Sequence, residues 1–109
     1  MTTITISKDK KGSYRQLLCS GHAGFAKSGS DIVCASVSVL VINTINALEE
    51  LAKESFETTV NEDNGFIRCD FTQPLQERSV FLLDTMVYGL KNIQKEYGKR
   101  YLQVKFEEV

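Results

Sequence analysis

The stretch DIVCASVSVLVINTINALEELAK, residues 31–53, decides the fold class, because its composition favours a strand and its spacing favours a helix. Its many β-branched residues favour a strand by propensity. A strand of this length, however, would far exceed the ~3–10 residues that are usual. The spacing agrees with a helix, because apolar residues recur at i, i+4 and i+7: Val33, Val37, Leu40, Val41, Ile45, Leu48 and Ala52. We therefore predict a helix over residues 31–53.

The opposite face of this predicted helix is polar and carries Ser36, Asn43, Asn46, Glu50 and Lys53. The first half of the helix is apolar nearly all round. A helix of that kind is usually buried. We therefore expect it to be central in the domain and well covered by other elements.

Strands are predicted on both sides of the helix. Residues 2–8 alternate, with Ile4 and Ile6 facing inward and Thr3, Thr5 and Ser7 facing outward, and residues 14–20 form a second strand. After the helix, strands over 56–61 and 66–72 flank a turn at Asp63-Asn64-Gly65, a sequence that favours a hairpin. A second helix over 76–97 ends at Gly98, and a last strand over 100–107 buries Leu102, Val104 and Phe106.

The element order is therefore ββαββαβ. Two helices and a mostly antiparallel sheet of about five strands predict a two-layer α+β fold. A chain of 109 residues without a repeat or a proline-rich linker is expected to form one domain, residues 1–109.

Composition excludes several classes of protein. The net charge of -1, with 42% hydrophobic and 25% charged residues, is typical of a soluble globular protein and gives no basic field for nucleic acid. The polar N-terminus predicts no signal peptide, and no apolar run approaches the ~20 residues of a membrane span. The three cysteines fit neither a disulfide framework nor a zinc pattern, so we expect no metal and a reducing, cytoplasmic compartment.

The candidate chemistry lies in GHAGFAKSGSDIVC, residues 21–34, which holds the only histidine, His22, and Cys34. If Ser30 or Asp31 caps the helix, Cys34 lies in its first turn. Unpaired N–H groups and the helix dipole favour a thiolate there, and the same N–H groups can stabilise an oxyanion. Any Cys–His mechanism in this chain must use His22.

Structural roles are equally compatible with these residues. A histidine at a strand end is often solvated, and a helical cysteine is often a small hydrophobic core residue. Asp31 is a helix cap, a group that orients His22, or an unfavourable charge near Cys34. Ser38, one turn after Cys34, either hydrogen-bonds near the sulfur, contacts substrate or bonds to the helix backbone. Core packing is the better interpretation of the two remaining cysteines, Cys19 and Cys69.

The segment GHAGFAKSGSDIVCASVSVL, residues 21–40, resembles the signature of the ribosomal-processing cysteine protease family Prp. The Gly21-His22 pair, eleven intervening residues, and Cys34 opening a helix all match that signature. Asp31 to Ala35 and Ser38 match the family's helix start as well. The resemblance implies that Cys34 is the nucleophile and His22 the base, with Gly21, Asp31 and Ser38 as possible supporting residues.

The resemblance also implies a substrate and an assembly. Members of the family remove a short N-terminal extension from the twenty-seventh protein of the large ribosomal subunit, after an aromatic residue, for ribosome assembly. The resemblance further implies that this protein is a homodimer and uses no cofactor. A loop that closes over the peptide maps here to Ala23, Gly24, Phe25, Ala26, Lys27, Ser28, Gly29 and Ser30. A non-catalytic ribosome-associated binding module and a redox-sensing thiol protein remain the alternatives.

Overall fold

A computed structural model of the chain describes residues 1–21, 32–61 and 65–109. The elements follow the predicted ββαββαβ order: β1 (Thr2–Lys8), β2 (Tyr14–Ser20), α1 (Ile32–Glu50), β3 (Glu57–Asn61), β4 (Phe66–Asp70), α2 (Glu77–Tyr97) and β5 (Leu102–Glu108). The predicted bounds differ from these by only a few residues. Asp63 and Asn64 of the predicted turn lie outside the described residues.

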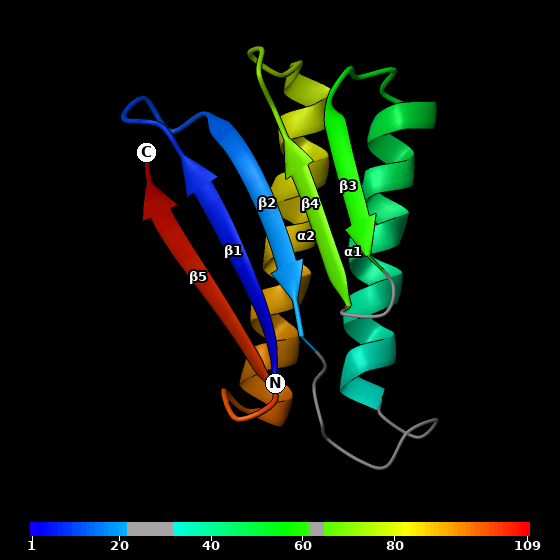
Figure 1. The fold of residues 1–109 in the computed structure, drawn as a ribbon, viewed down its shortest axis with the longest axis vertical. Coiled ribbons are helices and arrows are strands. Elements are labelled where there is room, and N and C mark those ends of the chain that lie inside the picture. Colours follow the sequence, from blue (N-terminus) through cyan, green and yellow to red (C-terminus); the bar gives the residue numbers. More distant parts are fainter. Residues whose placement is uncertain (22–31, 62–64) are drawn as a thin grey trace.

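The five strands form one sheet in the order β3-β4-β2-β1-β5. Three pairings are antiparallel, and only β1 and β5 are parallel, with Ile4 opposite Val104. Both helices cover the same face of the sheet (Figure 1). The two-layer α+β prediction is therefore confirmed, and β3 and β5 form the edges of the sheet.

The core lies between the sheet and the two helices. Ile4, Ile6 and Leu17 from the strands belong to one hydrophobic cluster with the buried faces of both helices. From α1 these are Val33, Val37, Val41, Ile45 and Leu48, and from α2 they include Leu83, Met86 and Leu90. The apolar stripe predicted for residues 31–53 is thus the face that α1 buries.

The rest of the α1 surface is more exposed to solvent than predicted. Val39 is 69% exposed and Ile42 is 47% exposed, so the helix is not covered all round. The physical reason is that the fold has only two layers: Val39 lies in a shallow hollow with Gly89 and Ile93 of α2, and Ile42 lies in the open groove beneath β3. The helix ends at Glu50, before the predicted Lys53, which adopts a left-handed conformation (φ 55°) that ends helical geometry.

By length and composition alone, α1 could cross a membrane, so the expectation that no apolar stretch approaches that length is wrong. A core helix of a globular domain meets the same criteria. The buried stripe of α1 is in fact part of the core of this domain.

Two side chains differ in burial from the prediction. Ser7 is buried, because it lies in a small hollow that Gln16, Asp70 and Val109 also line, just before the register shift between Ser7 and Lys8. Phe106 is 51% exposed, because it lies on the edge strand β5, where the Lys91 ammonium group sits 4.9 Å from its ring centroid. Leu102 is buried as predicted, and Val104 is half-buried.

Several polar contacts tie α2 to the rest of the domain. The buried Tyr14 hydroxyl donates a hydrogen bond to Asp84 Oδ1 at 2.5 Å. At the start of α2, where Gln76 makes no side-chain cap, Glu54 Oε1 accepts hydrogen bonds from the Gln76 backbone N–H (3.1 Å) and the Ser79 hydroxyl (2.7 Å). Glu54 therefore supplies from a distant segment the acceptor that a helix N-terminus requires.

Candidate active site

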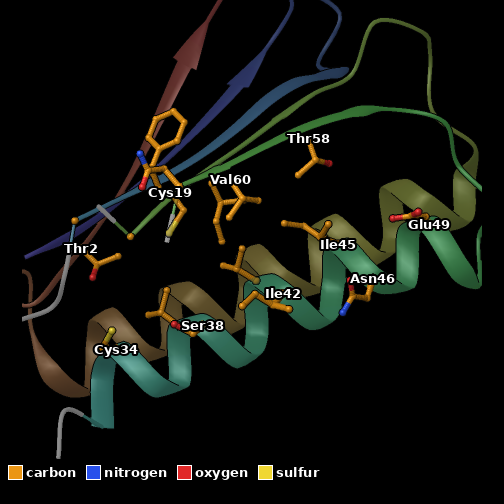
Figure 2. A pocket seen from close by; sticks show the side chains of 17 residues that line it. Thr2, Cys19, Cys34, Ser38, Ile42, Ile45, Asn46, Glu49, Thr58 and Val60 are labelled. Carbon is orange, nitrogen blue, oxygen red and sulfur yellow. The ribbon is translucent and has the colours of Figure 1, made fainter. Parts of the chain in front are cut away.

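A groove of about 550 Å³ runs along α1 beneath the hairpin of β3 and β4 (Figure 2). One side is a ridge of α1 residues spaced by three or four positions, and the other side comes from the strands. The α1 side carries Cys34, Val37, Ser38, Val41, Ile42, Ile45, Asn46 and Glu49. The strand side carries Thr2, Cys19, Gly21, Thr58, Val60, Asn61, Gly65, Phe66 and Ile67.

Cys34 lies at one end of this groove, in the first turn of α1, and its side chain is half-buried. The backbone N–H groups of a first helical turn have no partner within the helix, and the helix dipole adds positive potential. Both effects favour an anion at this position, whether a thiolate or the oxyanion of an attacked carbonyl. The prediction that Cys34 opens the helix is confirmed; a catalytic role is not decided by its position.

Gly21 also lines the groove, and its surroundings explain why the residue before His22 is a glycine. Its φ is 85°, a conformation that L side chains rarely adopt. A Cβ at this position would overlap the backbone carbonyl oxygen of Met1. Only glycine therefore fits between the end of β2 and the start of β1.

Ser38 is half-buried and faces the groove one turn after Cys34, as the spacing predicted. His22, Asp31 and the predicted substrate loop, residues 23–30, lie outside the described residues. Their roles therefore stay predictions.

Cys19 and Cys69 are buried, as expected of core residues. Burial raises the pKa of each thiol to about 11, so both are protonated at neutral pH. The nearby Cys34 adds to the rise for Cys19. Cys19 also lines the groove, as Cys34 does.

Several groove residues were not singled out from the sequence. Thr58 and Val60 lie on β3, every residue of which is exposed, and strand alternation alone did not reveal that they face a groove. Asn46 was assigned to the polar outer face of the helix, yet it lines the groove. The reason is that the groove follows the flank of α1, between its buried stripe and its solvent face. Among the described residues, no cluster of three or more His, Cys, Asp or Glu side chains could hold a metal.

A thiol in the first turn of a helix, at the end of a groove that can hold an extended peptide, is the arrangement of a cysteine peptidase. The family model described as Cysteine protease Prp matches residues 1–103. The chain therefore belongs to the cysteine protease Prp family and is a cysteine peptidase.

Similar proteins agree with this assignment. The Ribosomal processing cysteine protease Prp of Bacillus subtilis is 29% identical over 101 residues, which cover 89% of this chain and 90% of the relative. The protein of the same name from Staphylococcus aureus is 26% identical over 99 residues, with coverage of 91% and 93%.

Solved structures show the same fold. The S. aureus ribosomal processing protease Prp with a covalently linked product peptide superposes with a TM-score of 0.92 at 24% identity, over 98% of this chain and all of the other. The Streptococcus mutans protein SMU.848 superposes with a TM-score of 0.86 at 29% identity, over all of this chain and 96% of the other.

Proposed function

We propose that this cysteine peptidase removes the short N-terminal extension of a large-subunit ribosomal protein, the twenty-seventh, by cutting after an aromatic residue. The observation that carries the proposal is Cys34 at the end of a groove with an apolar centre. The names of the relatives supply the ribosomal substrate class. A further S. aureus Prp structure, with a TM-score of 0.87 at 23% identity, contains a substrate peptide.

In the proposed mechanism, the Cys34 thiolate attacks the scissile carbonyl, and N–H groups of the first turn of α1 stabilise the oxyanion. Protonated His22 gives its proton to the leaving amine. Neutral His22 then activates the water that releases the acyl group from Cys34. The loop of residues 23–30 closes over the peptide, and Asp31 and Ser38 are supporting residues.

The groove suits an extended apolar peptide. In addition to Cys34 and Ser38, apolar side chains such as Ile42, Val60 and Phe66 line the groove. Ile42 is 47% exposed and Val60 is 56% exposed. Covering these two side chains with the substrate would remove apolar surface from water, which favours binding.

The direct test is cleavage of the ribosomal protein with its extension in place, followed by mass spectrometry of the products. We expect one cut after an aromatic residue. Cys34→Ala and Cys34→Ser are expected to remain folded and to abolish the cut, and His22→Ala is expected to lose most of the activity. A normal rate for Cys34→Ala would exclude Cys34 as the nucleophile.

The proposal includes a homodimer in the cytoplasm. Support comes from exposed large apolar side chains on the helices, Val39 on α1 and Phe81 and Tyr88 on α2, each about 70% exposed. Surfaces of this kind often mark protein interfaces. Light scattering with size-exclusion chromatography measures the mass, and a monomer at micromolar concentration would contradict the dimer.

A redox-sensing thiol is the second candidate, because Cys19 lines the same groove as Cys34. Peroxide would oxidise both thiols to a disulfide with loss of two protons and two electrons. A reversible Cys19–Cys34 disulfide, detected by mass spectrometry, would support this role. Its absence at peroxide concentrations that oxidise Cys34 would exclude it.

A further inference from the structure

The end of the groove far from Cys34 is polar and acidic. Asn46 and Glu49 line it, and Figure 2 shows Cys34 and Glu49 at opposite ends of α1. Both polar side chains are exposed, and within the described part of the chain neither makes a hydrogen bond or an ion pair. The Glu49 carboxylate is therefore available to a bound peptide.

The backbone reinforces the negative charge of Glu49. The last turn of α1 contains no basic residue, and it carries both Glu49 and Glu50 next to the negative end of the helix dipole. Acidic side chains are unfavourable at this end of a helix, whereas a cation there is stabilised. The helix thus favours an anion at Cys34 and a cation at Glu49.

The length of the groove fixes where that cation lies in a substrate. Fifteen positions separate Cys34 from Glu49, and about 1.5 Å of rise per helical residue makes the distance about 22 Å. An extended peptide covers this distance with about six or seven residues at about 3.3 Å each. In the proposed function the chain before the cut is a short free end, whereas the chain after the cut continues into a whole protein, so we place the residues before the cut along the groove.

We propose that Glu49, together with Asn46, forms a specificity subsite for a cationic group of the substrate, six or seven residues before the cleaved bond. The group is either a lysine or arginine side chain or the α-ammonium group of the extension itself. The subsite rests on the proposed function, since it deepens the specificity of the same groove. It selects peptides whose charge stands at a fixed distance from the bond attacked by Cys34.

The test uses three synthetic peptides that share the sequence around the cleaved bond. The first is acetylated and has lysine seven residues before the bond, the second has glutamine there, and the third begins at that glutamine with a free α-amine. We expect kcat/KM for the wild-type protein to be about two- to fivefold higher for a cationic peptide than for the neutral one, the range of exposed ion pairs. The difference is expected mainly in KM and to shrink at high salt.

Glu49→Gln is expected to bring this ratio to about one, and Glu49→Lys to invert it. Glu50→Gln is the matched control, because Glu50 is exposed in the same turn but does not line the groove, and it should keep the wild-type ratio. Unfolding midpoints of all three variants exclude loss of structure as the cause. The lysine peptide and the free-amine peptide show which of the two cationic groups the subsite prefers.

An unchanged ratio in Glu49→Gln, or an equal loss in Glu50→Gln, would overturn the subsite while leaving the proposed function intact. Cleavage of none of the peptides by the wild-type protein would instead contradict the proposed function. Even in that case, the affinity of the labelled peptides for Cys34→Ala, measured by fluorescence anisotropy, tests the subsite. Equal affinity for the charged and neutral peptides would refute it.

Discussion

Substitution of Gly21 by alanine is expected to destabilise the fold for two reasons, which a comparison with Gly12→Ala can separate. The first is the left-handed backbone (φ 85°), which costs a residue with a Cβ about 1–2 kcal/mol. The second is the overlap of that Cβ with the Met1 carbonyl oxygen. Gly12 has the same φ but nothing within 4 Å of a Cβ, so Gly12→Ala carries the first cost alone.

The second cost follows from what holds Met1 in place. The next residue, Thr2, donates its backbone N–H to the Tyr101 carbonyl at 3.0 Å, and β1 pairs with β2 from Thr3 onward. Moving the Met1 carbonyl away from a Cβ at position 21 strains or breaks the contact with Tyr101, a loss of about 0.5–1.5 kcal/mol. We therefore expect Gly21→Ala to destabilise the protein by about 1 kcal/mol more than Gly12→Ala.

Urea unfolding of both variants measures the difference in stability. Both proteins carry a short N-terminal tag, so that Met1 and its carbonyl remain part of the chain. The effect of alanine on the unfolded chain is similar in the two variants and cancels. In thermal unfolding, a difference of 1 kcal/mol corresponds to about 4–8 °C for a domain of similar size. Equal stability of the two variants would refute the steric argument. Because Gly21 borders both the groove and His22, we also expect only Gly21→Ala to lose peptidase activity.

Three further outcomes follow from the site and the core. Iodoacetamide at pH 7 should alkylate Cys34 well before the two buried cysteines, whose pKa values are about 11, and uniform alkylation would place Cys34 in the core. Burial and the hydrogen bond to Asp84 raise the pKa of Tyr14, so this residue stabilises the fold below pH ~10 and the contribution is lost as the pH rises further. Tyr14→Phe, at a cost of about 1–2 kcal/mol at pH 7, should remove that alkaline dependence in urea titrations. Burial acts to raise the pKa of Glu54, but hydrogen bonds from groups such as the Ser79 hydroxyl outweigh it and lower the pKa, so its stabilisation is present above pH ~4.5 and lost below. Glu54→Gln should flatten the acid limb of the stability curve, and an unchanged limb would contradict the capping role.

The periodicity of residues 31–53 was enough to predict α1 and the face that it buries, because a core stripe must repeat with the helical turn. The same periodicity could not predict how many neighbours the helix has. Val39 is as apolar as Val37, but it lies in an open hollow beside α2 that no third layer covers. The number of layers is a long-range property that local patterns do not contain.

The groove was predictable at one end only. Cys34 and Ser38 could be placed from the start of the helix and the spacing of one turn. Asn46 was assigned to the solvent face because the sequence pattern divides the helix into only a buried face and a polar face. Asn46 lies on the flank between the two, which faces another element. Thr58 and Val60 become groove residues only through the pairing of β3 with β4, which sets the edge strand over α1.

The parallel pairing of β1 with β5 has a consequence for the synthesis of the protein. Of the five strands β5 is the last in the chain, so one edge of β1 stays unpaired during synthesis until β5 has been made, as does the Thr2 N–H that bonds to Tyr101. An unpaired strand edge is a template for pairing with another chain. We therefore expect a chain released before Leu102 to be prone to aggregation.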